Sequence, residues 1–66
     1  MSIKQFNRKV RHELKTDLED IYLKFVRQNK KYIEERISAF FKDKKSVTET
    51  KNNIIETVYY SWCVYG

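Results

Sequence analysis

Residues 17–43 read DLEDIYLKFVRQNKKYIEERISAFFKD, and the apolar side chains in this stretch recur mostly three or four positions apart. That spacing places them along one side of an α-helix, which turns once in about 3.6 residues. The whole chain has no proline, and its single glycine is Gly66. Because glycine and proline are the usual helix breakers and turn formers, the sequence predicts an all-α protein.

We expect residues 17–43 to form one long or kinked helix. Acidic residues crowd the start of this stretch and lysines crowd its end, an arrangement that suits the helix dipole. The segment 27–31, Arg-Gln-Asn-Lys-Lys, is its weak point. Asn29 can alternatively end one helix there and let a second begin.

Three tetrapeptides fit the capping box, in which Ser or Thr and a Glu or Gln three residues later satisfy the first backbone N–H groups of a helix. They begin at Ser2, Thr16 and Ser46, where we expect helices to start. Residues 57–65 have high strand propensity, but no second strand is evident to pair with them, so helix is the expectation. The prediction is one helical domain, residues 1–66, folded as a small antiparallel three-helix bundle.

The first segment separates apolar and basic residues onto different sides of a helix. Its apolar seam consists of Ile3, Phe6, Val10 and Leu14. A second stripe, which we call the basic ridge, consists of Lys4, Arg8, Arg11 and Lys15. The ridge is either a solvated face or a contact for an acidic protein surface, anionic lipid or phosphate.

Composition narrows the function classes. The formal net charge is +5. Ten of the 66 residues are aromatic, which is more than a small core buries easily. We therefore expect some of them, Trp62 included, to face a partner. The only cysteine and histidine are Cys63 and His12, with no third orienting group evident, so we expect no enzyme, no metal and no cofactor. No apolar run approaches the roughly 18 residues that span a membrane, and no transmembrane segment is expected.

Residues 21–27, Ile-Tyr-Leu-Lys-Phe-Val-Arg, resemble the motif of the LYR-motif family of small mitochondrial adaptor proteins. The family pattern is Leu-Tyr-Arg, one variable residue, two apolar residues and a basic one. Tyr22, the Phe25-Val26 pair and Arg27 match it; Leu23 stands where the family has arginine, and Lys24 supplies a charge one position later. In residues 32–49, Phe41 and Lys42 resemble the phenylalanine and basic residue that close the family's second helix.

This resemblance implies a non-enzymatic adaptor in the mitochondrial matrix that serves iron–sulfur cluster biogenesis or respiratory-complex assembly. The implied partner is the acidic acyl carrier protein. Tyr22, Lys24 and Arg27 would meet that partner, and Phe41 would anchor the second helix on the third.

Two other classes stay open from the residues themselves. One is a small phage- or plasmid-type protein, cytoplasmic, that binds and inhibits a host protein through the aromatic tail around Trp62. The other is a basic module that associates with nucleic acid or the ribosome, which the net charge of +5 allows. A helix-turn-helix reading is disfavoured because the short turn of that motif usually contains glycine.

Overall fold

The computed structural model describes the backbone of residues 1–65 and the side chains of residues 1–61. Within these residues the chain forms four α-helices and no strand, so the all-α prediction is confirmed. The helices are α1 (Ile3–Asp17), α2 (Asp20–Gln28), α3 (Lys30–Lys42) and α4 (Val47–Tyr65). Residues 57–65 belong to the last helix rather than to a strand, as expected.

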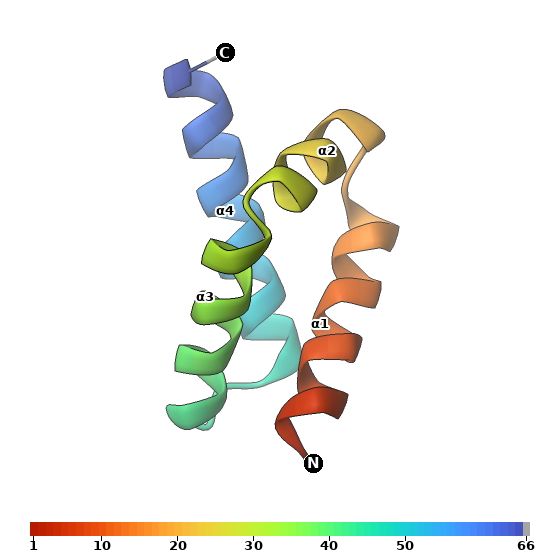
Figure 1. Cartoon of the computed structure of the whole chain (residues 1–66), viewed down its shortest axis with the longest axis vertical. Helices are drawn as coiled ribbons and strands as arrows, with labels where there is room; N and C mark the ends of the chain where they lie inside the picture. Colours follow the sequence, from red (N-terminus) through yellow and green to blue (C-terminus); the bar gives the residue numbers. More distant parts are fainter. Residues whose placement is uncertain (66) are drawn as a thin grey trace.

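Three of the helices lie along the long axis of the molecule (Figure 1). α3 runs opposite to α1 and α4, and all three pack against one another. The short α2 crosses between the end of α1 and the start of α3, and α4 rises past it to the C-terminus. The antiparallel alternation of the predicted bundle is thus present, but with four helices in place of three.

The break at Asn29 corrects the prediction of one continuous or kinked middle helix. Asn29 has φ −114° and ψ 37°, and it is the only residue between α2 and α3. Its backbone N–H donates to the carbonyl oxygens of Phe25 and Val26, and its side-chain Nδ2 donates to that of Phe25 at 2.9 Å. The carbonyl oxygen of Phe25 thus accepts from both the backbone and the side chain of Asn29, which fixes Asn29 at the end of α2. A helix end at Asn29 is the alternative that the sequence left open.

The helix starts at Ser2 and Ser46 are confirmed. The Oγ atom of Ser2 accepts from the N–H of Gln5 at 3.2 Å, and the Gln5 side chain accepts from the N–H of Ser2 at 3.1 Å, a complete capping box. The Oγ atom of Ser46 accepts from the N–H of Glu49 at 3.1 Å.

The helix start predicted at Thr16 is wrong. Thr16 lies inside α1, and its hydroxyl donates to the carbonyl oxygen of His12 instead of accepting from a backbone N–H. α1 ends at Asp17, and Leu18 follows with an extended backbone. Leu18 is buried, with only 5% of its surface exposed. Burial of Leu18 therefore sets the junction, and α2 begins two residues later.

One core joins all four helices. α1 contributes three residues of its predicted apolar seam, whereas Ile3 is 40% exposed. Near the α3–α4 turn, the rings of Phe6 and Phe41 pack with their centroids 5.3 Å apart. The buried apolar residues are Phe6, Val10, Leu14, Leu18, Leu23, Val26, Ile33, Ile37, Ile54 and Val58.

The turn after α3 uses lysine where such turns usually use glycine. Lys44 has φ 59°, in the left-handed region, and its N–H donates to the carbonyl oxygen of Phe41. The N–H of Lys45 donates to that of Phe40, and the two bonds together form a Schellman motif. A side chain with a Cβ atom strains this conformation.

We expect Lys44→Gly to raise the free energy of unfolding by about 0.5–1 kcal/mol, because glycine adopts positive φ without steric cost. Urea denaturation monitored by far-UV circular dichroism measures the change. Lys44→Ala, which removes the same charge and keeps the Cβ atom, is the control and should give no gain. Equal stabilisation by both variants would show that charge, not backbone strain, is responsible.

An ion pair at the edge of the core connects the end of α1 with α4. The Nζ atom of Lys51 lies 2.9 Å from Oδ2 of Asp17 and 4.0 Å from Oε1 of Glu13, and its side chain is only 14% exposed. The hydrogen bond to Asp17, together with the negative charges of Asp17 and Glu13, holds the pKa of Lys51 above its ordinary value of 10.5, although partial burial opposes the shift.

This pKa shift gives stability a dependence on pH at the alkaline end. Charged Lys51 makes its full contribution to the free energy of unfolding below its ordinary pKa of 10.5. This contribution is lost as pH rises through the higher pKa that Lys51 has in the folded state. We therefore expect the free energy of unfolding to fall less steeply above this pH in Lys51→Met than in the parent. Lys30→Gln, at an exposed site, serves as the control; identical slopes for the parent and Lys51→Met would contradict this reading.

Candidate functional site

A groove lies between α1 and α2. Its volume is about 580 Å³, and its apolar lining comes from Leu14 of α1 and from Leu23 and Val26 of α2. All three are core residues, so the hydrophobic core reaches this surface at the groove. The extended Leu18-Glu19 junction keeps the two helices apart at one end of it.

Cationic side chains surround this apolar lining. The four residues of the basic ridge all line the groove, and Arg27 lines it from α2. Asn7 and His12 complete the lining, and the residues described there include no carboxylate. The structure thus brings together the ridge and three residues of the stretch 21–27, Leu23, Val26 and Arg27, which sequence analysis had treated separately from the ridge.

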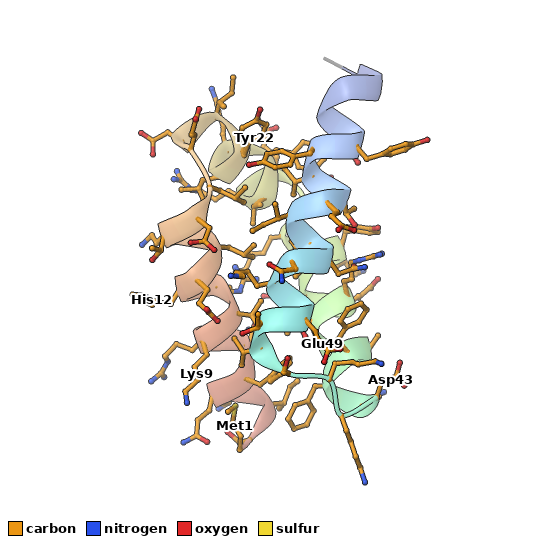
Figure 2. All side chains as sticks on the ribbon, turned by 180° about the vertical axis from the view of Figure 1, so that it is seen from behind. Met1, Lys9, His12, Tyr22, Asp43 and Glu49 are labelled. Atoms are coloured by element: carbon orange, nitrogen blue, oxygen red, sulfur yellow. The ribbon has the colours of Figure 1, made fainter. Side chains whose placement is uncertain are left out.

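The acids of α1 point to a different side of the helix. Glu13 and Asp17 pair with Lys51 of α4, and Figure 2 shows α4 beside α1 in the view from behind. Neither carboxylate makes an ion pair with a described cation of the groove, although Glu13 lines a neighbouring hollow together with Arg8 and His12.

Arg11 differs from its neighbours on the ridge. Its Nη2 atom donates to Oε1 of Glu34 on α3 at 3.2 Å, and its Nε atom donates to Oδ1 of Asn7 at 3.1 Å. This arginine connects α1 with α3 and is partly neutralised. The cations of the groove that are exposed and make no ion pair with a described residue are Lys4, Arg8, Lys15 and Arg27.

The other predicted partner-binding residues lie apart from the groove. Tyr22 is half-buried, with its ring against that of Tyr59 at 4.8 Å between centroids, and Lys24 is exposed on α2. Phe41 lies near the opposite end of the molecule, where its ring contact is with Phe6 of α1. Trp62 lies outside the described side chains.

Sequence analysis missed Leu23, one of the two apolar side chains that α2 supplies to the groove. Leu23 had been read only as a substitution for the arginine of the family motif, yet it is 9% exposed and part of the core. Its spacing of three residues from Val26 is helical, and this was the signal that could have identified it.

Comparisons with known protein families, curated proteins and solved structures found no match to this chain. Among the residues that the structure describes, no group of three histidine, cysteine, aspartate or glutamate side chains is placed to hold a metal ion. No helix in this part of the chain is both long and apolar enough to cross a bilayer.

The exposed ridge cations should contribute little to folding. We expect the free energy of unfolding of the triple variant Lys4→Gln, Arg8→Gln, Lys15→Gln to lie within about 0.5 kcal/mol of the parent's value. Substitutions on the surface usually change it by no more than this. Arg11→Gln is the comparison, and loss of its contact with Glu34 should cost up to about 1 kcal/mol. Urea denaturation measures both; a larger loss in the triple variant would assign the ridge to folding rather than to binding.

Proposed function

We propose that this protein is a small non-enzymatic adaptor, and that the groove between α1 and α2 binds an acidic amphipathic helix of a partner protein. The observation that carries the proposal is the composition of the groove: an apolar lining from the core surrounded by exposed cations and no carboxylate. An isolated apolar cleft would not indicate the charge of its occupant, whereas this one favours a negative partner.

The groove favours a helical occupant because two helices form its walls. A partner helix can place apolar side chains on Leu14, Leu23 and Val26 and direct its acidic side chains toward the cations at the edge. Leu14, Leu23 and Val26 are at most 9% exposed, so they offer a partner only a narrow apolar strip. The exposed cations at the edge raise the association rate and select the orientation. The net charge of +5 adds long-range attraction for an acidic protein.

We further propose that the partner is an acyl carrier protein, as the resemblance to the LYR-motif family implies, with the mitochondrial matrix as the corresponding location. Arg27 supports this because it belongs both to the resembling stretch and to the groove. The buried Leu23 leaves Lys24 and Arg27 as the exposed cations of that stretch.

A second proposal is a small protein that inhibits a host protein through the aromatic surface of α4. The observation that favours it is the exposure of Tyr59 and Tyr60, at 43% and 73%. Exposed aromatic side chains are typical of binding hot spots. Under this proposal Tyr60→Ala would abolish binding and the groove cations would not matter.

Purified acyl carrier protein, titrated by isothermal calorimetry, tests the first proposal. We expect Lys15→Gln with Arg27→Gln to weaken binding by about 10-fold, because two charge contacts at the edge of the groove are lost. Lys30→Gln with Lys31→Gln is the matched control: it removes two exposed cations outside the groove and should bind like the parent.

Two results would contradict this proposal. Absence of any heat of binding would exclude the carrier protein, and equal weakening in both double variants would exclude the groove. A titration with single-stranded RNA in parallel tests the nucleic-acid alternative, since phosphate binding falls steeply with salt concentration.

A further inference from the structure

The end of the molecule where α3 meets α4 carries a second group of cations. Lys42 lies in the last turn of α3, and Lys44 and Lys45 follow in the turn. All three are exposed, and none makes an ion pair with a described residue. We call this group the lysine end. Asp43 is the one acid in the segment, so residues 42–45 carry a net charge of +2.

Apolar surface lies directly beside the lysine end. A hollow of about 630 Å³ has Met1, Phe6, Phe41 and Val47 in its lining, together with the three lysines. The side chains of Met1 and Ile3 are 65% and 40% exposed. Figure 2 shows Met1 and Asp43 at the same end of the molecule. Phe6 is buried and Phe41 and Val47 are half-buried, so Met1 is the exposed apolar side chain in the lining of this hollow, beside the three lysines.

We propose that the lysine end docks this protein on an anionic phospholipid surface. Apolar side chains enter the boundary between headgroups and acyl chains, and lysine ammonium groups lie among the negative headgroups. Because few apolar side chains are exposed there, their burial in the bilayer alone contributes too little free energy to keep the protein bound to the membrane. Association therefore depends on negative lipid and is reversible.

The chemistry of this end favours lipid over nucleic acid. Its cations are lysines, which act as compact point charges and lack the fork geometry with which arginine binds a phosphate in two places. Bases bind single-strand sites by stacking on aromatic rings, and here Phe6 and Phe41 already pack against each other. A diffuse negative surface that also accepts apolar groups fits these side chains better.

This surface is separate from the groove proposed for the partner helix. The groove and the hollow have no lining residue in common, although Lys4 and Arg8 of the groove lie near the same end of α1 as Met1 and Phe6 of the hollow. Leu14, Leu23 and Val26 do not line the hollow at the lysine end. The inference therefore stands independently of the proposed function, and failure of one leaves the other in place.

Co-sedimentation with vesicles tests the inference. We expect the purified full chain to sediment with vesicles of equal parts phosphatidylcholine and phosphatidylglycerol and to remain in solution with phosphatidylcholine alone. Lys42→Gln, Lys44→Gln and Lys45→Gln together should lower the partition coefficient by about 10-fold to 100-fold, since each lysine near an anionic surface contributes to binding. Ile3→Ser, at an exposed position, should also weaken sedimentation without loss of helix content.

A charge-matched variant separates the lysine end from net charge. Lys24→Gln, Lys30→Gln and Lys31→Gln together remove three exposed cations from α2 and the start of α3, and this variant should sediment like the parent. Equal losses in the two triple variants would overturn the proposal, because binding would then follow net charge alone. Equal sedimentation with both vesicle types, or with neither, would overturn it as well. Circular dichroism of each variant verifies that the fold is retained.

Discussion

The distribution of side chains around α1 determines most of this structure. One side buries Phe6, Val10 and Leu14 in the core, a second directs Glu13 and Asp17 to Lys51, and a third carries the basic ridge. Because the acids are paired across to α4, the ridge keeps its net positive charge at the surface. The same helix therefore supplies the centre of the core and the charged wall of the groove.

The connections between helices are made without glycine or proline. Asn29 spans α2 and α3 as a single residue, with its side chain bonded to Phe25, and Lys44 adopts positive φ at the end of α3. Each connection is short, so neighbouring helices are held close, and their apolar sides must face one another.

Sequence reasoning predicted the helical class, the caps at Ser2 and Ser46 and the alignment of the basic ridge, because these depend on local spacing. It failed at Thr16 and at the continuity of residues 17–43. The capping pattern at Thr16 is locally valid, but burial of Leu18 moved the junction. On one continuous helix Leu23, Val26, Ile33 and Ile37 would already share one side, because they are 3, 7 and 4 residues apart. Their spacing therefore gave no sign of the bend at Asn29, after which α3 runs along the long axis while α2 crosses from the end of α1. The groove was not predicted because α2 forms one of its walls, and α2 was expected to be part of one long helix over residues 17–43.

The brevity of α2 has a thermodynamic consequence. A helix of nine residues is too short to persist by itself in water, so its order depends on the burial of Leu23 and Val26. These are the side chains that α2 contributes to the apolar lining of the groove. A ligand seated there binds the folded arrangement and not the unfolded segment, so occupancy and local folding are linked equilibria. Ligand binding would then appear in hydrogen exchange as slower opening of α2, while the long helices set the stability of the rest.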